Sequence, residues 1–167
     1  MNGSLPQALH AGSSDADVLE YLRTSSVTPA MALLGCEALA VNKGAMSCKA
    51  RFVADSKLCN GAGQIFGGQL CAMLDLVTSM ALAATLRFTA GFVTLELKTS
   101  FLSSTKPGVI YGEAVVKRLG SKIAFLEGPE QRRRFADRAR KCHSLDQPED
   151  VIGHRREVMK RLFSNLG

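Results

Sequence analysis

The sequence predicts an α+β protein in which an antiparallel sheet curls around one long central helix. Two strand-like segments precede the helical segment, and at least three follow it. The helix, expected over residues 67–86, is apolar on nearly every side, because Leu70 and Val77 keep helical spacing while Leu76 and Met80 lie off that stripe. A helix with no polar face for water has to be buried, and a sheet wrapped around it is the economical packing.

The residues before the first strand predict a leader followed by two short helices. Residues 1–13 are expected to form a flexible leader, and Ser14 can cap a helix over residues 16–23. A second helical turn over residues 30–34 should end at Gly35, since glycine readily adopts the conformation that closes a helix.

Five segments have the composition and bounding turns of strands. They are residues 36–42 and 45–53 before the central helix, and residues 92–102, 109–119 and 123–127 after it. Residues 55–63 are expected to form a loop. Together these elements predict a main domain over residues 30–128, preceded by a leader and short helix over residues 1–29.

The composition changes at Gly128, after which residues 129–167 are expected to form a basic helical tail. Residues 130–167 hold ten Lys and Arg against six Asp and Glu, or +4 of the chain's net charge of +6. A basic, helix-prone stretch reaches Lys141, and residues 151–166 have the pattern of an amphipathic helix. Such a tail is either a solvated helical face or a module that binds nucleic acid or an anionic surface.

Composition also bears on compartment and partners. The five cysteines are odd in number and form no C-x-x-C pair, which is typical of free thiols in a reducing compartment. The first residues lack the basic start and apolar run of a signal peptide, so a cytoplasmic location is expected. Without Trp and with only two Tyr, stacking platforms are scarce, and no nucleic-acid partner is expected. Residues 70–86, interrupted by Asp75, are expected to be too short and too polar to span a membrane.

The segment from Asn60 to Asp75 contains the residues that could take part in a reaction. Gly67 and Gly68 stand where a loop becomes the buried helix, and the first amides of a helix lack acceptors within it. With the positive end of the helix dipole, those amides favour a developing oxyanion. Asp75, two turns on, is a carboxylate in an apolar helix, where it either caps a neighbouring amide or takes part in catalysis.

Other types of site are not indicated. The glycines have neither dinucleotide-binding spacing nor the lysine of a P-loop. The three histidines, His10, His143 and His154, lie far apart and outside this segment, so neither a metal site nor a His-based triad is expected. Cys71, one turn before Asp75, is interpreted as a packing residue rather than a nucleophile. No cofactor is implied.

The order of these residues resembles hotdog-fold thioesterases of the phenylacetyl-CoA (PaaI) type, from about Ala30 to Glu127. The residues that carry the resemblance are Asn60, Gly63, Phe66-Gly67-Gly68, Leu74-Asp75, Val93-Thr94-Leu95-Glu96-Leu97, Phe101-Leu102 and Gly108. The resemblance implies a hotdog fold, hydrolysis of acyl-CoA or aroyl-CoA, and a homodimer or a tetramer of dimer pairs.

The resemblance also implies residue roles. Asp75 would be the general base or nucleophile, and the Gly67 amide would polarise the thioester carbonyl. Asn60 would orient water or substrate, and Thr94 would hold the attacking water. Gly68, Phe66 and Gln69 would contact the substrate. Asp75 would face the Asn60–Gly68 loop of a partner subunit, so the dimer would be obligatory for activity.

Two departures from the family pattern leave alternatives open. Phe66 stands where the family usually has His. One alternative is therefore a protein that binds acyl-CoA without hydrolysing it. After Glu127 the family continues into a final apolar strand, whereas this chain has Pro129 and an arginine run. The tail is then either a divergent native segment or the product of a shifted reading frame, and in either case the sheet would lose a strand or expose an edge.

Overall fold

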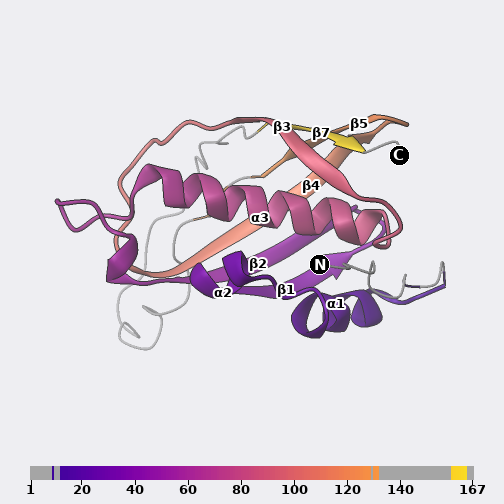
Figure 1. The fold of residues 1–167 in the computed structure, drawn as a ribbon, viewed down its shortest axis with the longest axis horizontal. Helices are drawn as coiled ribbons and strands as arrows, with labels where there is room; N and C mark the ends of the chain where they lie inside the picture. Colours follow the sequence, from indigo (N-terminus) through magenta and orange to yellow (C-terminus); the bar gives the residue numbers. More distant parts are fainter. Residues whose placement is uncertain (1–8, 10–11, 129, 132–158, 165–167) are drawn as a thin grey trace, which may run out of the picture.

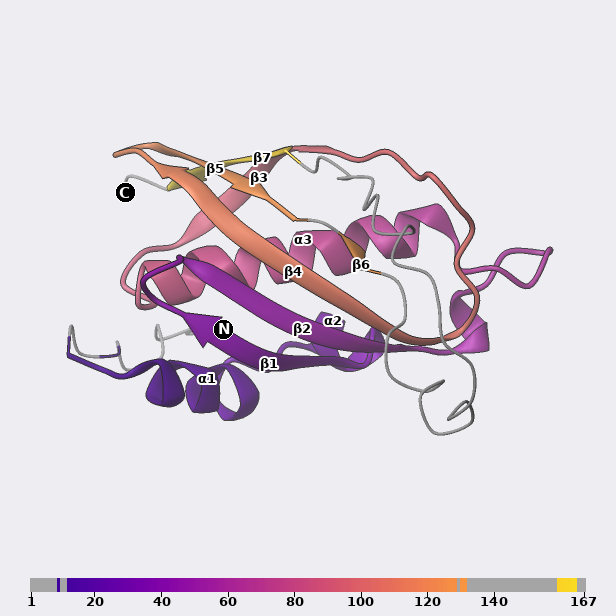
Figure 2. The ribbon, with the colours of Figure 1, turned by 180° about the vertical axis from the view of Figure 1, so that it is seen from behind.

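The fold is one antiparallel sheet that curves along a central helix, as expected. The computed structural model describes residues 9, 12–128, 130–131 and 159–164. The helices are α1 (Asp15–Thr24), α2 (Pro29–Leu33), the 3-10 turn η1 (Ser56–Leu58) and α3 (Gly67–Thr85). The strands are β1 (Cys36–Asn42), β2 (Ser47–Ala54), β3 (Phe92–Lys98), β4 (Gly108–Leu119), β5 (Ile123–Glu127), β6 (Glu130–Gln131) and β7 (Met159–Ser164). The strand order is β1-β2-β4-β5-β7-β3, with β6 paired to β4, and the sheet follows the length of α3 (Figures 1 and 2).

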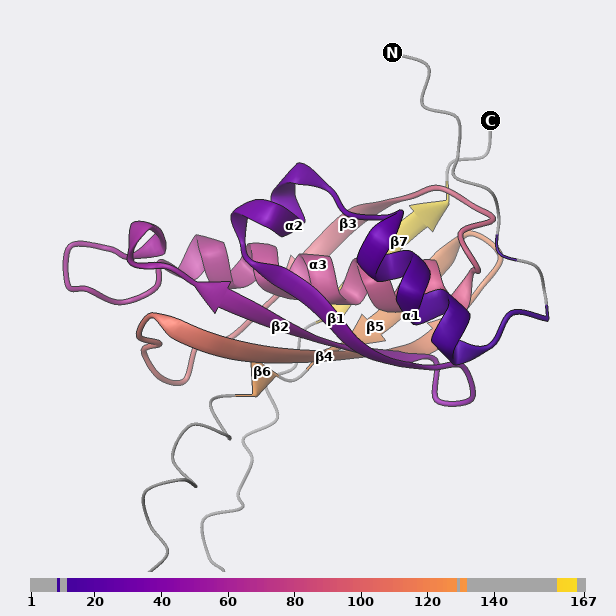
Figure 3. The ribbon, with the colours of Figure 1, turned by 90° about the horizontal axis from the view of Figure 1, so that it is seen from below.

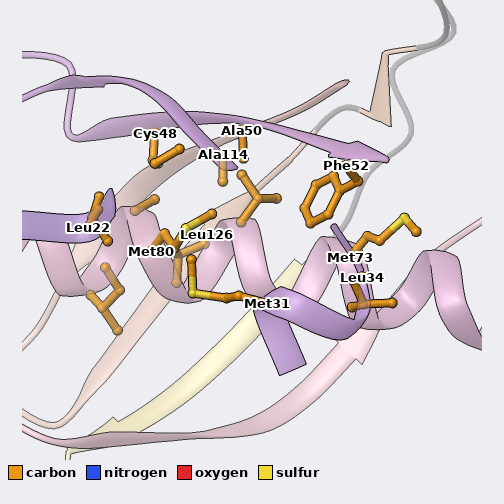
Figure 4. Packing of buried hydrophobic residues seen from close by; sticks show 14 of the residues in the cluster. Leu22, Met31, Leu34, Cys48, Ala50, Phe52, Met73, Met80, Ala114 and Leu126 are labelled. Atoms are coloured by element: carbon orange, nitrogen blue, oxygen red, sulfur yellow. The ribbon is translucent and has the colours of Figure 1, made fainter. Parts of the chain in front are cut away.

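The core lies between α3 and the sheet. Nine residues of α3 are buried: Leu70, Met73, Leu74, Val77, Thr78, Met80, Ala81, Leu82 and Ala84. They meet inward residues of the strands, among them Phe52 (1% exposed) and Leu126 (0% exposed), and Figure 4 shows this packing. Thr78 is accommodated because its hydroxyl donates to the Leu74 carbonyl oxygen at 2.9 Å. The apolar pattern of α3 is therefore explained by burial in one protein core.

By length and composition, α3 is nevertheless apolar enough to cross a membrane. The mean hydropathy of this 19-residue helix, taken over its most apolar window, is 1.3. The expectation that the segment is too short and too polar to span a membrane was therefore wrong on both counts. A single carboxylate, that of Asp75, does not make this helix too polar for a membrane span by composition. More than half of that window is buried inside the protein, which is typical of a core helix.

Helix α1 packs onto the outer strand β1 and contributes to the same core. Ser14 caps it as predicted, since its hydroxyl accepts from the Asp17 amide while the Asp17 carboxylate accepts from the Ser14 amide. Val18 and Leu22 are each 1% exposed, and Arg23 Nε donates to the Ala38 carbonyl oxygen at 2.8 Å. The division of the chain at residue 29 stays a prediction, but this helix packs as part of the main domain.

Gly35 joins α2 to β1 in a conformation that requires glycine. Its φ is +58°, and a Cβ there would lie 2.8 Å from the Val53 carbonyl oxygen. We expect Gly35→Ala to lower the free energy of unfolding by about 1–3 kcal/mol, measured by urea denaturation. Gly61→Ala is the matched control, because a Cβ at Gly61 meets nothing within 4 Å. Equal stability of the two variants would contradict this prediction.

Two strand boundaries differ from the prediction by two residues or more. β2 starts at Ser47 rather than Ala45, because Met46 has φ 47° and still belongs to the turn. β3 ends at Lys98 rather than Leu102. Its pairing with β7 ends there, and the chain then leaves the sheet and crosses to the other end of α3, where the Thr105 carbonyl oxygen accepts from the Ile65 amide at 2.7 Å.

The expected helix over residues 151–166 is also corrected. Residues Met159–Ser164 form β7, which pairs with β5 on one side and β3 on the other. Without β7, the facing edges of β5 and β3 would be unpaired. The backbone N–H and C=O groups of these edges favour a strand that pairs with them over a separate helix. The basic stretch up to Lys141, also expected to be helical, lies outside the described residues.

Candidate active site

The N-terminus of α3 presents two backbone amides toward solvent. Phe66 is the N-cap, and its side chain makes no capping hydrogen bond. The amides of Gln69 and Leu70 both donate to the Phe66 carbonyl oxygen, at 2.9 Å and 3.3 Å. Within the described part of the chain, no acceptor is found for the amides of Gly67 and Gly68. Because a helix dipole adds positive character at this end, these two amides can bind an anionic oxygen.

The loop that leads into α3 is closed by its own hydrogen bonds. Asn60 Oδ1 accepts from the amides of Ala62 and Gln64, at 2.9 Å and 3.2 Å, and the Asn60 amide donates to the Gln64 carbonyl oxygen at 2.7 Å. The side-chain oxygen of Asn60 therefore shapes the loop. Contact of Asn60 with water or substrate stays a prediction. The side chain is exposed, and its amide nitrogen could donate to such a ligand.

Two aromatic rings flank the two glycines. A Cβ on Gly67 would lie 3.4 Å from Cε2 of Phe101, and one on Gly68 would lie 3.4 Å from Cδ1 of Phe66. Both rings are largely exposed, Phe66 at 58% and Phe101 at 44%. Phe66 was expected at this site. In the sequence, Phe101 is only part of the family motif. Its position beside Gly67 depends on the crossing of residues 99–107, which sequence periodicity does not reveal.

Asp75 and Thr94 meet across the gap between α3 and β3. Thr94 Oγ1 donates a hydrogen bond to Asp75 Oδ1 at 2.8 Å, which joins two residues predicted for the site from segments 19 positions apart. Asp75 is half-buried, so the carboxylate is partly shielded but still accessible. The threonine hydroxyl orients the carboxylate and keeps lone pairs that can accept from a water molecule.

The other predicted residues fall into a separate cluster at the start of the helix. Gly67, Gly68, Phe66 and half-buried Gln69 all lie within its first turn, whereas Asp75 is eight residues further along α3. At 1.5 Å per residue, the Gly67 and Asp75 backbones of one chain are about 12 Å apart along the helix axis. One chain thus brings Asp75 and Thr94 together but holds the glycine amides apart from them.

The cysteines of the sheet are poor candidates for this chemistry. Burial raises the pKa of the Cys36 and Cys48 thiols to about 12, so both stay protonated near neutral pH. Both belong to the β1–β2 hairpin, and Cys48 is completely buried in the core. Within the described ranges, no three His, Cys, Asp or Glu side chains come together in a way that would hold a metal ion.

Comparison with known proteins places this geometry in a wider context. The model of the Thioesterase superfamily matches residues 62–128, which include Gly67, Asp75 and Thr94. A protein of Ralstonia eutropha JMP134, described as a thioesterase and as related to phenylacetic acid degradation, is 29% identical, with a TM-score of 0.65 over 89% of this chain and 98% of its own. No curated protein sequence matches the chain.

Two further solved structures share the fold at lower identity. The PaaI protein from the phenylacetic acid degradation operon of E. coli is 14% identical, with a TM-score of 0.64 over 93% of this chain and 98% of its own. A thioesterase family protein of Silicibacter pomeroyi is 18% identical, with a TM-score of 0.66 over 91% and 98% of the two chains. The chain therefore spans nearly the full length of these proteins.

Proposed function

Because this chain is a PaaI-type hotdog protein of the thioesterase superfamily, we propose that it hydrolyses acyl-CoA or aroyl-CoA thioesters to the free acid and CoA. The family match and the fold support thioester hydrolysis in general. The proposal adds CoA thioesters as the substrate and assigns roles to individual residues. The observation that carries it is the hydrogen bond of 2.8 Å between Thr94 Oγ1 and Asp75 Oδ1.

In this proposal Asp75 acts on the thioester carbonyl carbon as general base or as nucleophile. As base, it accepts a proton from a water molecule held by Thr94, and the water oxygen bonds to the carbonyl carbon. The tetrahedral intermediate then collapses, the C–S bond breaks, and the proton on Asp75 is returned to the departing thiolate. As nucleophile, Asp75 first forms an anhydride and expels the thiolate, and water then hydrolyses the anhydride.

The negative charge of the intermediate needs donors that are already in place. The Gly67 amide, assisted by that of Gly68, supplies them at the positive end of α3. Phe66 at the N-cap supports this role, because a Ser, Thr or Asp there would offer its own side-chain oxygen to the first-turn amides. The aromatic rings of Phe66 and Phe101 provide apolar contact for the acyl group.

The active site would be built from two chains. An oxyanion donor and the base each have to lie within about 3 Å of the reacting group, whereas the Gly67 and Asp75 backbones of one chain are about 12 Å apart. A two-fold dimer removes the conflict by setting the Gly67 amide of one subunit opposite the Asp75 carboxylate of the other. We therefore propose a homodimer as the minimal active unit, alone or paired into a tetramer.

Mixing two inactive variants tests this arrangement. Asp75→Asn removes the base but keeps the amide, and Gly67→Pro removes the amide but keeps the base. If the site is shared, co-refolding the two chains at equal amounts restores about a quarter of the wild-type rate, because half of the dimers are mixed and each holds one complete site. Thiol release from an acyl-CoA is the measurement. A mixture as inactive as either variant alone would show that the site lies within one chain.

The same assay separates the enzyme from the alternative of a binding protein. A protein that binds acyl-CoA tightly but releases no thiol above the uncatalysed rate would be a non-catalytic relative. A panel of aliphatic and aromatic acyl groups would then define the substrate range, which the exposed rings of Phe66 and Phe101 are expected to bias toward apolar acids.

A further inference from the structure

The loop that leads into α3 begins with an Asn-Gly pair. The sequence has four asparagines, of which Asn2 and Asn60 precede glycine, and of these two Asn60 lies in the described part of the chain. In such a pair, the backbone nitrogen of the glycine can attack the side-chain carbonyl carbon of the asparagine, because glycine has no Cβ to hinder the approach. The surroundings of Asn60 determine whether the folded protein permits this reaction.

The loop leaves the reacting groups open to solvent. It projects beyond the N-terminal end of α3, as Figure 3 shows. Asn60, Gly61 and Ala62 are exposed, and a Cβ added to Gly61 would meet no atom within 4 Å. In the described part of the chain, no acceptor is found for the Gly61 amide. Its nitrogen is therefore available as a nucleophile.

The hydrogen bonds of the Asn60 side chain favour the attack. Oδ1 accepts from the amides of Ala62 and Gln64, at 2.9 Å and 3.2 Å. The bond to Ala62 folds the side chain back over Gly61, the residue between them, and so brings Cγ toward the Gly61 nitrogen. Both bonds also polarise the Cγ carbonyl group and stabilise the negative charge that the attack places on Oδ1.

Asn42 is a reference asparagine in the same molecule. It is also exposed, and its Oδ1 also accepts a backbone amide, that of Ala45, at 2.8 Å. The next residue is Lys43, which has a Cβ, and the Lys43 amide donates to the Asp15 carboxylate at 3.2 Å to each oxygen. The nitrogen that would have to attack is thus both hindered and engaged in hydrogen bonds, so Asn42 should stay intact.

Conversion of Asn60 to an acid would change the charge beside the candidate oxyanion donors. An antiparallel bridge between Cys59 and Ile65 ties this loop to the residues that lead into α3. Between residues 55 and 68 the only acidic residue is Asp55, so a carboxylate at position 60 would be the second. A negative charge near the start of a helix competes with an oxyanion for the positive end of the helix dipole.

We propose that Asn60 is a self-modifying residue whose deamidation lowers the activity of the enzyme. The Gly61 nitrogen bonds to Asn60 Cγ, its proton passes to Nδ2, and the Cγ–Nδ2 bond breaks to release ammonia. Water then opens the resulting cyclic imide to aspartate or isoaspartate, so that one water molecule is consumed for each ammonia released. The effect on activity rests on the proposed function, whereas the modification itself does not.

The test incubates the purified protein at mildly alkaline pH and locates each modified residue by peptide mapping with mass spectrometry. The mass change from amide to acid should appear at Asn60 at least about tenfold faster than at Asn42. It should be no slower in the folded protein than in urea, because the two donors to Oδ1 are held in place only by the folded loop. In Gly61→Ala, conversion of Asn60 should slow about tenfold, while the fold and the initial rate of thiol release stay unchanged.

Activity is measured in the same samples. Thiol release from an acyl-CoA should fall in proportion to the converted fraction of Asn60, and it should stay constant in Gly61→Ala. Equal conversion of Asn60 and Asn42, or conversion of Asn60 about tenfold slower in the folded protein than in urea, would overturn the modification site. Conversion without loss of rate would overturn its effect on the enzyme. A protein that releases no thiol from the outset would contradict the proposed function, and the mass measurement would still decide the modification.

Discussion

The Asp75→Asn variant is expected to release thiol from acyl-CoA at least 10²-fold more slowly than the wild-type protein, while its thermal stability stays unchanged. The amide that replaces the carboxylate has the same shape, and its oxygen can still accept from Thr94 Oγ1, as Asp75 Oδ1 does at 2.8 Å. It cannot accept a proton from water at neutral pH, and it is a poor nucleophile. The loss should therefore appear in kcat, with little change in KM.

Glu113→Gln is the matched control for this substitution. It also removes one carboxylate from a partly buried position, but on β4, where Glu113 pairs with Lys49 at 3.4 Å. An ion pair that is still in contact with solvent contributes little, so both activity and stability should stay near wild type. If Asp75→Asn retains a near-normal rate, the carboxylate is not the reacting group, and the hydrolase mechanism proposed for this site is wrong.

The Gly67→Pro variant is expected to lose 10²–10³-fold in kcat, because proline removes one backbone donor and leaves the rest of the site in place. Proline is well tolerated at the first position of a helix, where the amide has no acceptor within the helix. The preceding residue, Phe66, already has the extended conformation that proline requires, with φ −63° and ψ 135°. The substitution thus tests the amide itself, which a change of side chain cannot do.

Gly67→Ala separates the loss of the amide from the addition of bulk. Alanine keeps the donor, and its Cβ would lie 3.4 Å from Cε2 of Phe101, a tight but tolerable contact. We expect its kcat to stay within about threefold of wild type, whereas Gly67→Pro loses most of its rate. Circular dichroism and melting temperature should show both variants folded. Equal rates for the two would mean that the Gly67 amide does not stabilise the oxyanion.

The sequence predicted most of the fold because its signals are local. The capping serine before α1, the glycine at the end of α2 and the apolar surface of α3 each depend on neighbouring residues alone. β1 and β5 were predicted with their observed bounds for the same reason. Where a strand stops depends instead on whether a partner continues beside it, so β3 was predicted four residues too long.

The C-terminal part shows the same limit more strongly. Val158, Leu162 and Leu166 have helical spacing, and the sequence contains no signal that this stretch faces an open gap in a sheet. In the structure, residues 159–164 pair with β5 and β3, because unpaired strand edges are satisfied by backbone hydrogen bonds whatever the side-chain period. Local preference was overridden by pairing between segments distant in sequence.

The chemical groups of the site can be predicted from the sequence: free amides at a Gly-Gly helix start, and a carboxylate two turns on in an apolar helix. Which groups they contact depends on the tertiary structure. Packing of β3 against α3 brings Thr94 to Asp75, and the crossing of residues 99–107 places Phe101 against Gly67. The reason is physical: the rise and turn of a helix set distances along one segment, whereas distances between segments are set by how the whole core packs.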